Sequence, residues 1–154
     1  MSDSIKHECG IALLRLLKPL QYYNDKYGSL FFGIYKMYLM LEKQHNRGQD
    51  GAGFASIKLD MNPGDSFMSR VRSSESQPIQ DVFSTINSEL NEVFQELGKN
   101  NLTNLEIKQA YPFLGELMMG HLRYGTFGNN EIGSVHPFLR QNNWKTRNLA
   151  LAGN

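Results

Sequence analysis

Apolar positions recur along the chain with the spacing of a helix face in two places. Between residues 34 and 41 they fall at i, i+3, i+4 and i+7, which predicts an amphipathic helix that ends near Gln44. The same kind of spacing between residues 82 and 97 predicts a second helix, closed by Gly98. A third, shorter helix is expected over Leu102–Ala110.

Short apolar runs bounded by turn residues predict the strands. They are Cys9–Leu17, Phe54–Leu59, Phe67–Arg72, Gly115–Leu122 and Asn148–Ala152. The first run is apolar almost throughout, which predicts a strand with both faces largely covered. Three segments are expected to be loops, linkers or turns: Gln21–Ser29, Ser73–Pro78 and Gln141–Asn143. Since strands and helices alternate in short runs, the predicted class is mixed α and β.

Composition narrows the function classes. The 154 residues are 40% apolar and 20% charged, as expected for one soluble globular domain. The net charge is +1 with dispersed cations, so nothing indicates a nucleic-acid or membrane partner. The most apolar stretch, Leu30–Leu41, is interrupted by Gly33 and Lys36, which argues against a membrane span. One cysteine allows no intrachain disulfide, so we expect a cytoplasmic location.

Four short motifs carry candidate chemistry. They are Cys9-Gly10-Ile11, the Gly-rich stretch 44–53 (QHNRGQDGAG), the stretch 120–126 (GHLRYGT) and Ala152-Gly153-Asn154. Taken singly, each has an ordinary interpretation: a small buried thiol, a tight turn, a solvated arginine and another turn. Together they resemble the class II glutamine amidotransferases, which are N-terminal-nucleophile hydrolases. Within that family they look most like the amidophosphoribosyltransferase group. The resemblance covers nearly the whole chain except residues 62–113.

The resemblance implies an α+β fold, the αββα sandwich of N-terminal-nucleophile hydrolases, in which two antiparallel sheets lie between helical layers. Here the sandwich is expected to be incomplete at its C-terminal side. Residues 1–8 resemble a leader that is removed, and residues 9–154 the N-terminal part of the amidotransferase domain. The expected partners are glutamine, a missing C-terminal phosphoribosyltransferase domain and, because sheet edges are left exposed, further copies of the chain in a homo-oligomer.

Amide hydrolysis requires a nucleophile and a base, and the resemblance assigns both roles to Cys9. A free thiol has a pKa of about 8.5 and a free α-amine a pKa of about 8, so an amine on the same residue can take the thiol proton. In the sequence as it stands, Glu8 precedes Cys9 and converts that amine into an amide. We therefore expect the unprocessed chain to be nearly inactive, and we expect this segment by itself, without the rest of the parent enzyme, to be weak or inactive as a glutaminase.

The remaining site residues also come from the resemblance. It implies that Arg123 pairs with the glutamine α-carboxylate in bidentate geometry, and that Thr126 offers a hydroxyl to the same ligand. Arg47 and Gly48 match the loop that lines the nucleophile, and Asn154 matches the oxyanion asparagine. No metal site is expected, because the four histidines lack ligand spacing. His121 and His136 are expected to be packed or capped instead.

The implied function is release of ammonia from glutamine for transfer to phosphoribosyl pyrophosphate in purine synthesis. No cofactor is expected in this segment, although the parent enzyme would use Mg²⁺ with phosphoribosyl pyrophosphate. Two alternatives stay open: the glutaminase of another class II amidotransferase, with a sugar phosphate or aspartate as acceptor, and a degenerate, non-catalytic fragment.

Overall fold

The computed structural model describes residues 8–98, 102–125, 131–141 and 148–153. The helices are α1 (Leu20–Tyr27), α2 (Phe32–Lys43), α3 (Pro78–Leu97) and α4 (Asn104–Ala110), with 3₁₀ turns at His45–Arg47 and Ile132–Ser134. The strands are β1 (Gly10–Arg15), β2 (Gly51–Ile57), β3 (Met68–Ser73), β4 (Leu117–Arg123), β5 (Phe138–Gln141) and β6 (Asn148–Leu151). In these ranges no helix is both long and apolar enough to cross a membrane.

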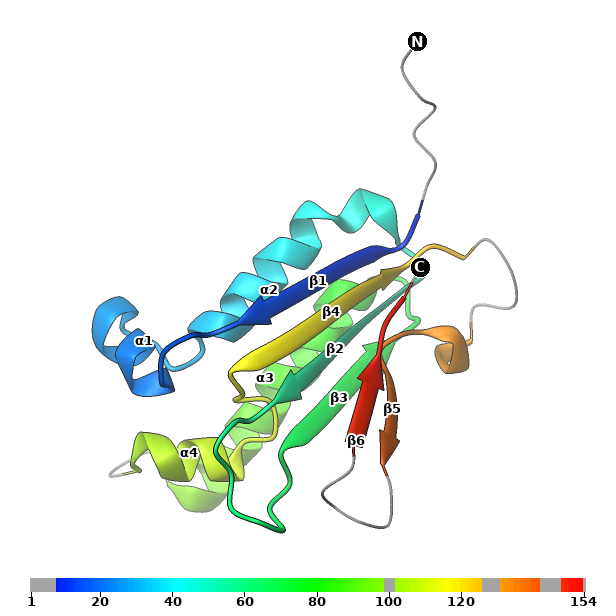
Figure 1. The fold of residues 1–154 in the computed structure, drawn as a ribbon. Helices are drawn as coiled ribbons and strands as arrows, with labels where there is room; N and C mark the ends of the chain where they lie inside the picture. Colours follow the sequence, from blue (N-terminus) through cyan, green and yellow to red (C-terminus); the bar gives the residue numbers. More distant parts are fainter. Residues whose placement is uncertain (1–7, 99–101, 126–130, 142–147, 154) are drawn as a thin grey trace.

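Strand β4 organises the main sheet, whose strand order is β1-β4-β2-β3 (Figure 1). It pairs antiparallel with both β1 and β2, so that Gly10 lies opposite Leu122 and Gly51 lies opposite Arg123. Because β4 runs against both neighbours, the starts of β1 and β2 meet the end of β4 at one end of the sheet. These three chain ends carry three of the four motifs.

Helices α2 and α3 cover one face of this sheet, and Figure 1 shows them behind it. The core forms between them and the sheet. Phe54 of β2 has its ring centroid 5.9 Å from those of both Phe83 and Phe113. A Cβ on Gly120 would lie 2.8 Å from Met37 Sδ and 2.9 Å from Leu41 Cδ2. Glycine at this position therefore lets α2 pack directly on the central strand.

The segment that leads into β5, residues 135–137, packs on the face of the main sheet that the helices leave uncovered. A Cβ on Gly53 would lie 1.9 Å from the carbonyl oxygen of His136, and one on Gly51 would lie 2.7 Å from Val135 Cγ2. Gly51 and Gly53 alternate along β2 with the residues that face the helices, so the 135–137 segment packs on the other side. The described chain is thus a mixed α+β fold with antiparallel sheets, as the sequence predicts at that level.

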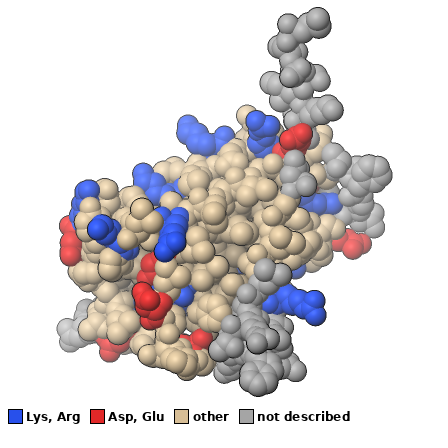
Figure 2. Space-filling view, viewed as in Figure 1, with Lys and Arg blue, Asp and Glu red and all other residues tan. Residues whose placement is uncertain are grey.

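Strand β1 is covered on one face only. Ala12 is 3% exposed under the helices, whereas Ile11 is 44% and Leu13 61% exposed on the other face. Figure 2 shows few charged side chains in the middle of this face. The prediction that both faces of the strand are covered is wrong for the described residues, because an apolar run cannot reveal whether the same chain supplies a second layer.

The sequence predicts a loop over Gln21–Ser29, and that prediction is wrong because most of the segment lies in α1. Only Leu20 of this helix is buried. It also makes aromatic contacts with α2, since the ring of Phe32 lies 5.2 Å from that of Tyr23 and 4.4 Å from that of Tyr27, and Asn104 of α4 donates a hydrogen bond to Gln21 Oε1. Ring stacking against α2, rather than an apolar stripe, holds this helix, so the helix period gives no signal.

The predicted linker Ser73–Pro78 is shorter in the structure. Ser73 is the last residue of β3, and Pro78 is the first residue of α3, a position that suits proline because its missing N–H has no partner there. Most of the predicted turn Gln141–Asn143 lies outside the described residues. The strand pair on either side of it, β5 with β6, is present.

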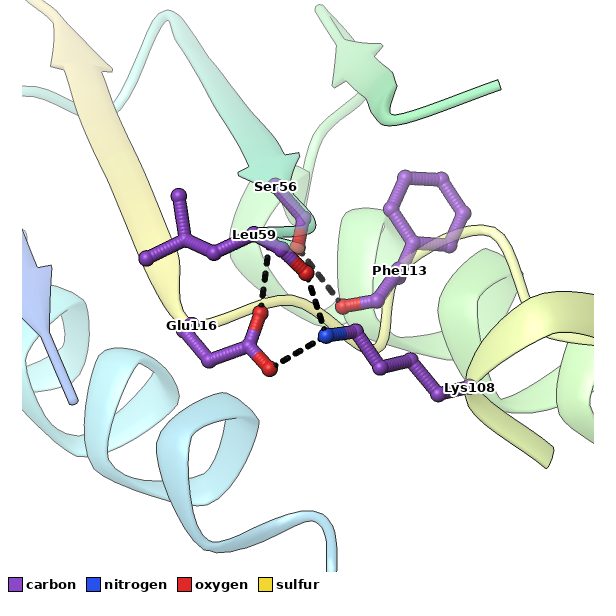
Figure 3. Close-up of polar contacts among 5 residues, drawn as sticks. All are labelled: Ser56, Leu59, Lys108, Phe113 and Glu116. Atoms are coloured by element: carbon purple, nitrogen blue, oxygen red, sulfur yellow. Dashed lines mark hydrogen bonds and ion pairs between the residues drawn. The ribbon is translucent and has the colours of Figure 1, made fainter. Parts of the chain in front are cut away.

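A polar cluster fixes the end of the sheet farthest from the motifs (Figure 3). Lys108 Nζ lies 2.6 Å from Glu116 Oε1 and donates to the Leu59 carbonyl at 2.6 Å. The Leu59 N–H donates to Glu116 Oε2 at 2.8 Å, and Ser56 Oγ donates to the Phe113 carbonyl at 2.8 Å. Lys108 and Glu116 are both buried, so the cluster ties α4 and the start of β4 to the end of β2.

Candidate functional site

The sequence motifs converge where the starts of β1 and β2 meet the end of β4. Cys9 immediately precedes β1, and Arg123 is the last residue of β4. The loop from Gly48 to Asp50 joins the 3₁₀ turn after α2 to the start of β2. Motifs more than a hundred residues apart in sequence are therefore neighbours, because the sheet register fixes their meeting point.

Cys9 is half-buried and contacts the backbone of Tyr124. The Tyr124 N–H donates to Cys9 Sγ at 3.4 Å, while the Tyr124 carbonyl lies 4.0 Å from the sulfur. A backbone N–H directed at sulfur stabilises negative charge on it, which is what a nucleophilic thiolate requires.

The loop 48–50 packs against the backbone that follows β4. A Cβ on Gly48 would lie 2.6 Å from both the carbonyl carbon and oxygen of Arg123, so only glycine fits there. The Asp50 N–H donates to the Arg123 carbonyl at 3.0 Å, and Asp50 Oδ2 accepts from the Gly125 N–H at 2.7 Å. Asp50 thus holds both ends of the short segment whose central N–H reaches Cys9.

Asp50 is the residue that the sequence interpretation did not single out. The signal was present, since an aspartate in a Gly-rich loop is a frequent acceptor for turn N–H groups. Its partner, however, is 75 positions away and is set by the pairing of β2 with β4. Arg47, which the resemblance assigns to the site, ends the 3₁₀ turn with an exposed side chain.

Arg123 is a buried cation at the end of the central strand, 6% exposed. It follows His121 by two residues, so the two side chains leave β4 on the face opposite the helices. Burial of a guanidinium requires compensating acceptors, and such a group is well suited to bind a carboxylate. Thr126 and Asn154, the other two predicted ligands, lie outside the described residues.

Gly153, the last described residue, returns to the same face. His121 Nε2 lies 3.1 Å from the Gly153 carbonyl oxygen, and the Gly153 N–H donates to His136 Nδ1 at 3.0 Å. The two imidazole centroids are 4.7 Å apart. His121 is 1% exposed, and burial is the main cause that lowers its pKa from 6.5 to about 4. The prediction that these histidines are packed is confirmed.

Among the hollows of the described chain, one lies near each end of the main sheet. One of about 250 Å³ is lined by the 3₁₀ turn and loop after α2 and by the start of α3, including His45, Gly48 and Gln49. The other, about 600 Å³, lies at the opposite end of the sheet beside α4. Neither is lined by Cys9 or Arg123. Within the described ranges, no group of three or more His, Cys, Asp or Glu side chains is arranged to hold a metal ion.

Comparison with known proteins gives no assignment: the chain matches no family model, no curated protein and no solved structure. The function proposed below therefore rests on the residues and geometry of the chain itself, together with the motif resemblance.

Proposed function

We propose that this chain is the glutamine-hydrolysing part of a class II glutamine amidotransferase of the amidophosphoribosyltransferase type. One observation carries the proposal: Cys9, the loop 48–50 and Arg123 meet at one end of the sheet, with the Tyr124 N–H donating to Cys9 Sγ. A nucleophile, a preorganised backbone donor and a buried cation are the groups that hydrolysis of an amino-acid side-chain amide requires.

In this proposal Cys9 works as an N-terminal residue, once Met1–Glu8 has been removed. Its free α-amine takes the thiol proton, and the thiolate attacks the side-chain amide carbon of glutamine. The tetrahedral intermediate collapses to a thioester as the amine returns the proton to the departing ammonia. Water then hydrolyses the thioester and releases glutamate. The Tyr124 N–H stabilises the sulfur whenever it carries negative charge.

The substrate contacts follow from the resemblance. Arg123 pairs with the glutamine α-carboxylate, Thr126 donates a hydroxyl to it, and Asn154 donates its side-chain N–H to the developing oxyanion. Burial of Arg123 supports its role, because a guanidinium with little access to water binds a carboxylate more strongly. Arg47 and Gly48 border the nucleophile.

The αββα sandwich belongs to the same proposal. Two observations support it: helices α2 and α3 cover one face of the four-stranded sheet, and the 135–137 segment that leads into β5 packs on the other face. The exposed Ile11 and Leu13 on the open face support packing of further strands of a second sheet against β1. As acceptor of the ammonia we propose phosphoribosyl pyrophosphate, on the motif resemblance alone; an assay of the complete protein with this acceptor, a sugar phosphate and aspartate distinguishes the possibilities.

The decisive experiment compares three forms of the complete protein: one that begins at Met1, one that begins at Cys9, and the latter with Cys9→Ser. We expect the chain that begins at Cys9 to hydrolyse glutamine at least about 100-fold faster than either of the others, the usual effect of a positioned general base. Intact mass and N-terminal sequencing must accompany each assay. Equal activity from a chain that retains Met1, or an undiminished rate in Cys9→Ser, would exclude the mechanism.

Substitution of Arg123 tests the substrate side. Arg123→Lys keeps the positive charge but loses the planar fork, so we expect the KM for glutamine to rise about 10- to 100-fold with a smaller change in kcat. Arg15→Lys is the matched control, since Arg15 is exposed at the opposite end of the sheet. An unchanged KM in Arg123→Lys removes Arg123 from the carboxylate site.

A further inference from the structure

A hollow of about 600 Å³ lies at the end of the main sheet opposite Cys9, between α1, the end of β1 and α4 (Figure 1). Hydrogen bonds join the elements around it. The Leu16 N–H donates to the Glu116 carbonyl at 2.7 Å, which ties the residue after β1 to the residue before β4. Asn104 of α4 donates to Gln21 Oε1 of α1, which joins the two helices. Pockets of this volume hold small organic ligands, so the hollow is large enough for one.

The apolar part of the lining is aliphatic, and among the described residues that line the hollow none is aromatic. The apolar lining residues are Leu16, Leu17, Pro19, Leu20, Leu59 and Leu105. Leu17 is 79% and Leu105 58% exposed, so a ligand in the hollow has aliphatic surface to remove from water. Because there is no ring on which a nucleobase can stack, the lining favours an aliphatic chain.

Lys108 contributes a nearly buried cation to the lining. Its side chain is 11% exposed, and its Nζ lies 2.6 Å from both Glu116 Oε1 and the Leu59 carbonyl oxygen (Figure 3). An ammonium group has three donors, so one N–H of Lys108 has no partner among the described residues. An unpaired N–H with little access to water is unfavourable, and an anionic oxygen in the hollow would satisfy it.

The charges around the hollow favour an anion. Arg15 and Lys18 line it as exposed cations together with Lys108, and the acidic residues in the lining are Asp60 and Glu116. Three cations thus share the lining with two carboxylates, one of which is already paired with Lys108. A ligand with one negative charge balances this excess, whereas a neutral ligand does not.

We propose that this hollow binds an aliphatic monocarboxylate, whose carboxylate accepts from Lys108 near Arg15 and Lys18 and whose chain lies against the leucines. A chain of roughly eight to ten carbons suits the size of the hollow. The inference does not depend on the proposed glutaminase function, because neither Cys9 nor Arg123 lines this hollow.

The first test is an NMR titration of the complete protein with octanoate, followed on the leucine methyl groups. Those of Leu16, Leu20 and Leu105 should shift, and those of Leu122, at the motif end of β4, should not. The Kd should fall about 2- to 4-fold for each CH₂ group added between butanoate and octanoate, because each group buries further apolar surface. Octanol has the chain without the charge and should bind at least about 10-fold more weakly than octanoate.

Substitutions at the rim test the site with little risk to the fold. Lys18→Glu should weaken octanoate binding about 3- to 10-fold and leave octanol binding unchanged. Lys43→Glu, exposed at the end of α2, is the matched control. Leu105→Gln should weaken the binding of both ligands about 3- to 10-fold, and Leu97→Gln at the exposed end of α3 is its control.

Lys108→Met tests the buried donor. It should weaken octanoate binding at least about 10-fold and leave octanol binding nearly unchanged, because methionine keeps the aliphatic contact but has no N–H to donate. Urea unfolding must show that this variant is folded; where it is not, the two rim variants decide.

Octanoate binding with these dependences on chain length, charge and rim residues supports the proposal. Leucine methyl resonances that octanoate does not shift would overturn it. Equal affinity for octanol would remove the anion site, and octanoate binding that is indifferent to both Lys18→Glu and Leu105→Gln would place the ligand elsewhere; either result overturns the proposal. None of these measurements uses glutamine, so the outcome is independent of whether the chain proves to be a glutaminase.

Discussion

Removal of Glu116 should destabilise the protein more than removal of its partner Lys108, although both belong to one buried ion pair. The reason is the charge balance of the cluster, in which Lys58 is also buried. Burial and then the neighbouring Lys108 lower the pKa of Lys58 to about 8, while Asp65 and Glu116 raise it. Around the buried carboxylate there are thus two lysines.

Glu116→Gln keeps a single acceptor oxygen for two donors, Lys108 Nζ and the Leu59 N–H, and leaves two cations close together without a compensating negative charge. We expect it to lower the free energy of unfolding by about 3 kcal/mol, the usual result when one partner of a buried pair is removed. Lys108→Met leaves the carboxylate with the Leu59 N–H and with Lys58 still near, so we expect only about 1 to 2 kcal/mol. The double variant should be less destabilised than the sum of the two.

Equilibrium unfolding in urea at pH 7 measures these differences, and Glu96→Gln on the exposed surface of α3 is the matched control. The penalty of Glu116→Gln should also shrink as the pH rises above 8, since Lys58 then loses its charge. If Lys108→Met destabilises the protein as much as Glu116→Gln, the charge balance of the cluster is not the deciding effect and this reasoning is refuted.

Three further predictions concern the fold. Gly53→Ala should destabilise the chain by at least about 2 kcal/mol, because its Cβ would overlap the His136 carbonyl oxygen, whereas Gly133→Ala, with no atom within 4 Å of its Cβ, should be nearly neutral in the same urea titration. The folded-state pKa of His121 is about 4 against an ordinary 6.5, so its stabilising contribution is present in full above pH 6.5 and is lost as the pH falls towards 4. The loss should approach about 3 kcal/mol, and His121→Gln should flatten this part of the pH profile. Thr103→Ala removes the N-cap of α4 and should cost about 1 kcal/mol in thermal unfolding, while Thr103→Ser should not; equal losses from both would exclude the cap as the cause.

Some elements could be predicted from local pattern because a single face is buried at regular spacing. In α2, Ile34, Met37 and Leu41 are all buried and follow the helix period, so the sequence locates the helix correctly. Helix α1 buries Leu20 alone among its residues, and its Tyr27 ring stacks on Phe32 of α2. Tertiary contacts stabilise this helix, so the spacing of apolar residues in its own sequence could not predict it.

The candidate site divides in the same way. The motif resemblance singles out Cys9, Gly48 and Arg123. The roles proposed for them are those of the nucleophile, of a glycine that lets backbone approach closely, and of the group that binds a carboxylate. The hydrogen-bond partners of Asp50 and of His121 could not be predicted from the sequence. Their partners lie 75 positions from Asp50 and 32 positions from His121 along the chain.

The sequence by itself determined which chemistry is available to this protein: one thiol, one arginine before a Tyr-Gly turn, a Gly-rich loop and two amphipathic helices. Only the tertiary structure decided that β4 runs antiparallel to both β1 and β2, which brings Cys9, Asp50 and Arg123 to one end of the sheet. The physical reason is that side-chain chemistry belongs to each residue separately, whereas proximity depends on strand register. Register in turn depends on the packing of α2 and α3 over the whole sheet.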